Sequence, residues 1–196
     1  RHVAIEVALK DRNGDRLWST SLEGEAFRQA DLVREAAGRL GAALVCDLDR
    51  SVRDHELAHE VRALYLEGCA RLADATSERD DKAIGALRQV VERAPKFGPG
   101  WAHLALAEFM AVPTTPIRER SNLVWTSGRH TEMALRLDPS LPEPFYIKAF
   151  GRRSYPGLMA DALPVVEDGL RRNPDNALLI GARAEILANF GMVREA

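Results

Sequence analysis

The chain has 196 residues, of which 46% are hydrophobic, and its 27 basic and 29 acidic residues give a formal net charge of −2. This length and hydrophobic share are enough for one large domain or two small ones. The near balance of charge argues against the broad positive surface by which proteins bind nucleic acid. No apolar run is long enough to span a bilayer, and we expect a cytoplasmic protein.

The first residues predict a β-hairpin. Residues 2–10 alternate between apolar and polar side chains, as a half-buried strand does. Asn13-Gly14 predicts a two-residue type I′ turn, because both central positions of that turn need positive φ. Such a turn places apolar side chains opposite one another on the two strands. The predicted pairs are Leu9 with Trp18, Val7 with Thr20, and Ile5 with Leu22.

A helix is predicted next, from about Phe27 to Asp47. Apolar residues recur there at intervals of four, three and four and make one stripe. The stripe consists of Val33, Ala37, Leu40 and Leu44. Two strands do not hold together alone in water, so this helix is predicted to cover the hairpin. We also expect more of the sheet before Arg1, and hence a longer parent protein.

The two cysteines, Cys46 and Cys69, both lie in apolar helical patterns. Their positions predict no metal-ligand pair with each other or with the histidines. We expect each to be a small buried hydrophobic residue.

From residue 62 onward the sequence repeats. Helical stretches end at Pro95, Pro139 and Pro174, which are 44 and 35 residues apart. The large apolar residues that open the following helices, Trp101, Phe145 and Ile180, have the same spacings. This period is typical of a helix-turn-helix unit of about 34 residues with insertions.

The repeats resemble tetratricopeptide repeats (TPRs). The segment "PGWAHLALAEF" is similar to a TPR first helix, and "DKAIGALRQVVERAP" and "MADALPVVEDGLRRNP" are similar to second helices. The segment "LLIGARAEILANFGMVREA" is similar to a first helix and the following turn, so the chain ends inside a repeat. The resemblance implies a mainly α fold in which residues 62–196 form a TPR α-solenoid of about three and a half helix pairs, truncated at its C-terminus.

The order of elements also resembles a bacterial arrangement. There, a TolB amino-terminal-like α/β domain precedes TPRs, and the pair is commonly attached to a winged-helix DNA-binding domain or a class III adenylate cyclase domain. The resemblance implies that residues 1–50 are the C-terminal part of such an α/β domain. Residues 51–61 would then be a linker and helix start. Neither output domain is in this sequence.

One motif suggests an enzyme instead. Residues 55–59, "HELAH", match the H-E-x-x-H pattern of zinc proteases, in which two histidines on one helical face bind zinc and the glutamate is the general base. A catalytic zinc site needs a third protein ligand. The metzincin positions hold Arg62 and Tyr65, and the only nearby acidic candidates are Glu67 and Glu78. We therefore expect a chance match, with no metal, no cofactor and no enzymatic activity.

TPRs bind partners on a concave surface, which the first helix of each pair lines. The resemblance implies a partner-binding groove of mixed aromatic, apolar and polar character, suited to an extended or helical peptide. Its predicted residues are Arg62, Tyr65, Cys69, Ala102, Leu106, Phe109, Tyr146, Phe150, Arg153, Glu185 and Asn189. The chain's own N-terminal segment or a second subunit could also fill such a groove.

Three functions stay open at this point. The first is a non-catalytic interaction and regulatory segment of a larger bacterial signalling or transcription-regulatory protein, with a protein or peptide partner and no nucleic acid bound. The second is the regulatory region of a class III adenylate cyclase. The third, a zinc hydrolase using His55, Glu56 and His59, is the remote alternative. The sequence leaves the oligomeric state open, including a homo-oligomer.

Overall fold

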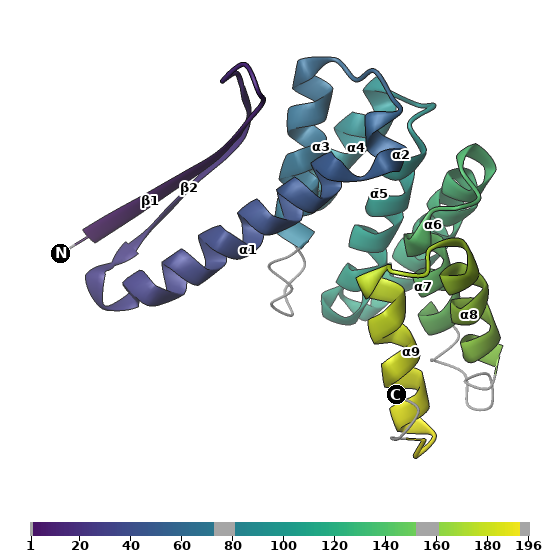
Figure 1. Ribbon diagram of the computed structural model, residues 1–196. Helices are drawn as coiled ribbons and strands as arrows, with labels where there is room; N and C mark the ends of the chain where they lie inside the picture. The colour runs from purple at the N-terminus through teal and green to yellow at the C-terminus, as the bar shows by residue number, and fades with distance from the viewer. Residues whose placement is uncertain (1, 73–80, 152–160, 193–196) are drawn as a thin grey trace. The chain divides into compact units, whose positions relative to one another are not determined.

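The computed structural model describes residues 2–72, 81–151 and 161–192. A two-stranded antiparallel hairpin, β1 (His2–Lys10) and β2 (Arg16–Glu25), precedes a series of helices (Figure 1). The described fold is therefore mainly helical, as predicted. The chain forms two compact units, residues 1–100 and residues 101–196. The boundaries predicted at residues 50 and 61 mark where the repeats begin in the sequence, whereas the two units are defined by compactness. The predicted boundaries therefore stay a prediction.

The hairpin register agrees with the prediction. Ile5 pairs with Leu22, Val7 with Thr20 and Leu9 with Trp18, which confirms all three predicted pairs. A register shift lies between Leu9 and Lys10, where the ladder approaches the turn.

The turn itself differs from the predicted type I′ form. Gly14 has a φ of +88°, but Asn13 has no positive φ. The Gly14 N–H donates to the Asp11 carbonyl oxygen at 3.0 Å, and the Asp15 carbonyl accepts from Asp11 N–H at 2.9 Å, which leaves a three-residue loop. The Asp11 carboxylate also accepts from the N–H groups of Asn13 and Asp15. This local side-chain cap favours the longer loop over the two-residue turn. The shift in register absorbs the added residue, so the apolar pairing is kept.

The helix α1 (Gln29–Leu48) follows a short 3₁₀ turn, η1 (Ala26–Arg28), and runs alongside the hairpin (Figure 1). Its bounds lie within two residues of the predicted ones. The predicted buried stripe is wrong, since Val33 is 50% and Leu44 is 40% exposed. The buried face instead contains Leu32 and Ala36, which pack with Leu22 and with Val3, Ile5 and Val7 of the hairpin. Small alanines bring the helix close to the strands, and a search for large apolar residues overlooks them.

The remaining helices of the first unit are α2 (Arg50–Arg53), α3 (His59–Leu72) and α4 (Asp81–Arg93). The helix α3 packs against both α1 and α4. Gly68 makes close packing of α3 on α4 feasible, because an added Cβ would lie 2.5 Å from Leu87 Cγ. The hairpin also reaches α3, where the Trp18 indole N–H donates to Glu67 Oε2 at 2.7 Å.

A disulfide joins Cys46 of α1 to Cys69 of α3, with Cα atoms 6.5 Å apart. The expectation of two unlinked buried cysteines is therefore wrong. Asp47, the next residue of α1, also pairs with Arg62 of α3 at 2.6 Å. Because the pairing depends on two helices that lie side by side, cysteine spacing alone does not reveal it.

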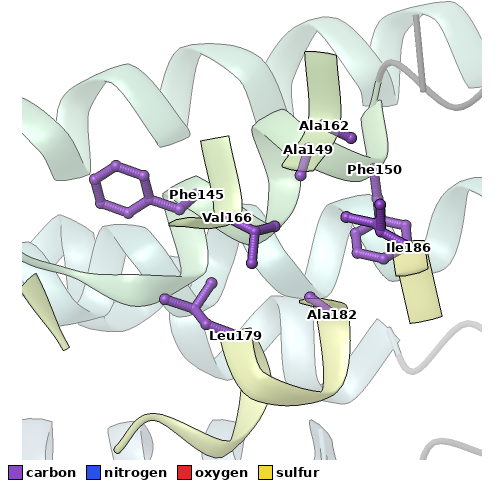
Figure 2. Close-up of a cluster of buried hydrophobic side chains, with 8 residues drawn as sticks. All are labelled: Phe145, Ala149, Phe150, Ala162, Val166, Leu179, Ala182 and Ile186. Carbon is purple, nitrogen blue, oxygen red and sulfur yellow. The ribbon is translucent and has the colours of Figure 1, made fainter. Parts of the chain in front are cut away.

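The second unit begins within α5 (Gly98–Ala111), just after Gly100. It continues with η2 (Val112–Thr114), α6 (Ile117–Leu137), α7 (Pro142–Gly151), α8 (Ala162–Arg172) and α9 (Ala177–Asn189). The helix α7 packs on α6, α8 and α9, and α8 also packs on α9. Figure 2 shows the core that α7, α8 and α9 share. Its buried members are Phe145, Ala149, Phe150, Ala162, Val166, Leu179, Ala182 and Ile186.

One turn recurs between successive helices. The helices α4, α6 and α8 each end two residues before Pro95, Pro139 or Pro174, which confirms that these prolines close helices. Each turn is then closed by a backbone hydrogen bond across four residues. The bonds run from Phe97 N–H to Ala94 O, from Leu141 N–H to Asp138 O and from Asn176 N–H to Asn173 O. The regular spacing of the prolines in the sequence therefore corresponds to a turn of the same hydrogen-bonding pattern after α4, α6 and α8.

Candidate partner-binding site

The second unit contains a cleft of about 900 Å³. Its walls come from α6 and α7, and the end of α5 with η2 closes it. Three of the predicted groove residues, Phe109, Tyr146 and Phe150, line this cleft together. Residues that are 41 positions apart in the sequence thus meet at one site.

The three aromatic rings form a continuous apolar surface. The rings of Phe109 and Tyr146 lie 6.2 Å apart, edge to face. The rings of Tyr146 and Phe150 lie 4.7 Å apart with a tilt of 32°. Phe150 also belongs to the buried core of α7, α8 and α9, which fixes the inner edge of the surface. Aromatic side chains that are held in this way lose little conformational entropy when a partner binds.

The helix α6 supplies a wall with small side chains. Ser121, Val124, Gly128 and Thr131 line the cleft at intervals of three and four residues, so they share one helical face. An added Cβ at Gly128 would meet no atom within 4 Å. The glycine therefore leaves open space over the wall.

The buried hydroxyl groups of α6 are hydrogen-bonded inside the unit. Ser127 Oγ donates to the Ala105 carbonyl at 2.9 Å, and Thr131 Oγ1 donates to the Ser127 carbonyl at 2.8 Å. Ser127 and Thr131 are both polar residues in a buried position. Their hydrogen bonds explain how the core accepts them.

The charged residues of the cleft also have partners within the unit. Arg120 donates to the carbonyl oxygens of Thr115 at 2.7 Å and Pro113 at 2.8 Å. Lys148 of α7 pairs with Glu132 of α6 at 2.9 Å, and this pair bridges the two walls. The cleft therefore offers a partner mainly apolar surface, with charges around it.

Two Glu–His contacts brace the helices near the cleft. His130 Nδ1 of α6 lies 2.8 Å from Oε2 of Glu108, a buried residue of α5. His103 Nε2 of α5 lies 3.9 Å from Glu143 Oε1 of α7. These contacts link α5 to both walls, and we assign them a structural role.

The other predicted groove residues are distributed differently. Arg62, Tyr65 and Cys69 belong to the first unit, where Tyr65 is buried against Phe97 and Cys69 forms the disulfide. In the second unit, Ala102 and Leu106 are buried, and Glu185 and Asn189 are exposed on α9. Arg153 lies outside the described residues.

The "HELAH" segment does not form one helix. The helix α3 begins only at His59, and residues 55–58 are not helical. Within residues 2–72, 81–151 and 161–192, neither histidine belongs to a group of three His, Cys, Asp or Glu side chains close enough to share an ion. Glu67 instead accepts hydrogen bonds from Trp18 and Arg71, and Glu78 lies outside the described residues. The helical spacing that the zinc motif requires is absent here.

Sequence reasoning missed the α6 wall. The predicted groove residues lie in the segments that the TPR resemblance treats as first helices, and none of them lies in α6. No sequence signal marks this wall, because the exposure of Ile117 (81%) and Val124 (54%) is a property of the folded chain.

Comparison of the chain with protein-family models, with curated proteins and with solved structures finds no match. In the described part of the chain, no helix combines the length and apolar character needed to cross a membrane.

Proposed function

We propose that the chain is a non-catalytic, protein-binding segment of a larger bacterial signalling or transcription-regulatory protein, and that it holds a segment of its partner in the α5–α7 cleft. The observation that carries this proposal is the continuous apolar surface, or aromatic floor, that Phe109, Tyr146 and Phe150 form in the cleft. Peptide segments commonly dock in hydrophobic or aromatic-lined grooves of this kind.

We further propose that the helices form a TPR-type solenoid. The recurrent proline turn supports this proposal, since a repeat architecture needs one connection geometry used several times. Glycine at a close helix contact supports it as well. An added Cβ at Gly169 of α8 would lie 2.8 Å from Leu179 Cδ1 and 2.9 Å from Phe145 Cβ.

The cytoplasm is the proposed location. Thiols are mostly kept reduced there, so Cys46 and Cys69 would mostly be two free thiols in that compartment and would form the disulfide under oxidising conditions. A regulatory region of a class III adenylate cyclase is the second candidate, and it would use the same cleft. The sequence that flanks this chain in the full-length gene distinguishes these two proposals.

The test uses a peptide display library and two matched variants. Gly128→Trp fills the cleft from α6, where an added side chain meets no neighbour. Gly38→Trp places the same side chain on an exposed glycine of α1 in the first unit, also without a neighbour within 4 Å. Peptides selected on the unchanged chain should bind Gly128→Trp at least about tenfold more weakly. They should bind Gly38→Trp as well as the unchanged chain. Equal binding to both variants would place the interaction elsewhere and refute the proposed site.

A further inference from the structure

The α6 wall continues beyond the cleft, and its two large apolar residues are Ile117 and Val124. Ile117, Ser121, Val124, Gly128 and Thr131 follow one another at four, three, four and three residues, so all five share one face of the helix. With a rise of 1.5 Å per residue, this face extends over about 21 Å, or roughly four helical turns. Its outer half is open to solvent, as the exposure of Ile117 and Val124 shows. The surface is thus long and narrow rather than compact.

The shape of this surface suits a helix better than an extended strand. An extended peptide gains affinity by pairing its backbone with free donors and acceptors at a sheet edge, and helices such as α6 and α7 have none along their sides. The hydroxyl groups of Ser127 and Thr131 already donate to carbonyl oxygens within the unit. A helical partner needs none of these groups, because its own backbone hydrogen bonds are internal. Small residues such as Gly128 allow the backbone of such a helix to approach closely.

The two helices that form the walls are basic overall, although the whole chain is acidic. Together α6 and α7 carry five basic and three acidic side chains, a net charge of +2, whereas the chain has −2. The basic residues are Arg118, Arg120, Arg129, Arg136 and Lys148, and the acidic residues are Glu119, Glu132 and Glu143. Arg120, Lys148 and Glu132 line the cleft, and the other charges lie elsewhere on the two helices. A net charge on the helices of a binding site favours a partner of opposite sign and speeds its association.

We propose that the segment bound in the cleft is an acidic amphipathic helix of about four turns, which lays its apolar face along the Ile117–Thr131 face of α6. This inference rests on the proposed function, since it specifies the partner of the same site. The apolar face contacts Val124 and the aromatic floor, and the acidic side chains of the partner lie toward the arginines of α6.

The experiment is a selection from a defined peptide library. The peptides have 16 residues, with apolar positions at helical spacing drawn from Leu, Ile, Met and Phe. The polar positions are drawn equally from Glu, Lys and Gln. The full chain and its Gly128→Trp variant are the two targets. We expect Glu to exceed Lys by at least about threefold among peptides enriched on the unchanged chain. We also expect no such enrichment on Gly128→Trp.

The outcomes distinguish the proposed binding site, the cleft, from the proposed partner, an acidic helix. Enriched peptides without a preference for Glu, which still fail to bind Gly128→Trp, would overturn the acidic partner and leave the cleft as the binding site. Peptides that bind both targets equally, or a library without any enriched member, would overturn the cleft as well. A central proline in the best peptide should abolish its binding, because it breaks the helix. Unchanged affinity of the proline peptide would overturn the helical conformation.

Reversing charges on the protein tests whether its basic residues attract the acidic peptide. Arg118→Glu combined with Arg129→Glu changes the net charge of the walls from +2 to −2. Both side chains are exposed; Arg118 pairs with Glu119, and Arg129 lies 4.8 Å from the ring centroid of exposed Trp125. Loss of these surface contacts should leave the fold intact, which the circular dichroism spectrum of the variant checks. The best acidic peptide should bind this variant about tenfold more weakly at low salt, with a smaller difference at high salt. Equal affinity at low salt would contradict the electrostatic part of the proposal.

Discussion

Replacing Cys46 and Cys69 together by alanine should lower the free energy of unfolding of residues 1–100 by about 3.4 kcal/mol at 25 °C. The disulfide closes a loop across a sequence separation of 23 residues. The disulfide lowers the conformational entropy of the unfolded chain, which destabilises the unfolded state. This entropy loss grows with the logarithm of the loop length, and a loop of this length gives about 3.4 kcal/mol. The loop includes α2 and the turn before α3, and it holds the hairpin and α1 against the first helix pair.

The assay is urea unfolding followed by Trp18 fluorescence. Trp18 is buried in the first unit, and replacing Trp101 and Trp125 by phenylalanine makes it the only reporter. With a slope of about 1–3 kcal/mol per molar urea, the midpoint should fall by about 1–3 M. Reductant should lower the midpoint of the cysteine-containing chain by a similar amount, because it opens the same loop.

Two controls make this prediction refutable. The doubly substituted chain should not respond to reductant, and the reduced cysteine-containing chain should be the more stable of the two by the small packing contribution of the sulfur atoms. A difference of less than about 1 kcal/mol between the oxidised and reduced chains would refute the reasoning, since loop closure predicts a much larger value.

Three further predictions concern other parts of the chain. Gly169→Ala should destabilise the second unit by about 1–3 kcal/mol in urea unfolding, because the new Cβ would lie within 3 Å of side chains from two neighbouring helices. Gly38→Ala is the control, and it should stabilise its helix by about 0.5–1 kcal/mol because the new Cβ meets no atom within 4 Å. Equal effects of the two alanines would contradict the close packing at α8. Trp18→Phe should lower the free energy of unfolding of the first unit by about 1–3 kcal/mol in thermal unfolding, because the part-buried Glu67 carboxylate loses one of its donors. An unchanged melting temperature would show that this hydrogen bond does not contribute to stability. Elemental analysis should find no stoichiometric zinc, with the same result for His59→Ala; one zinc per chain that disappears in the variant would revive the hydrolase hypothesis.

The features that depend on local periodicity were predictable from the sequence. Strand alternation fixed the pairing of Ile5, Val7 and Leu9, because a slip by one residue would turn the apolar side chains to the wrong face. The prolines at 95, 139 and 174 predicted the helix ends, since proline cannot continue a helix. These signals lie within a few residues of the structure they specify.

The features that depend on tertiary contacts were not predictable in this way. The side of α1 that faces the hairpin carries Leu32 and Ala36, and its close fit outweighs the larger residues on the other side of the helix. The disulfide requires two helices to lie side by side, and the cleft requires the end of α5 to meet α6 and α7. The aromatic members of the cleft came from the family pattern, but the α6 wall was missed because its residues are small or polar.

Photo-crosslinking from Ser121 tests the central claim most directly. This exposed side chain lines the cleft on α6, and a photoreactive amino acid can replace it without disturbing a buried contact. The same amino acid at Gly38 of α1 is the control. We predict that a peptide selected from the library crosslinks from position 121 and not from position 38. Crosslinking from position 38 alone, or equally from both, would contradict a binding site in the α5–α7 cleft.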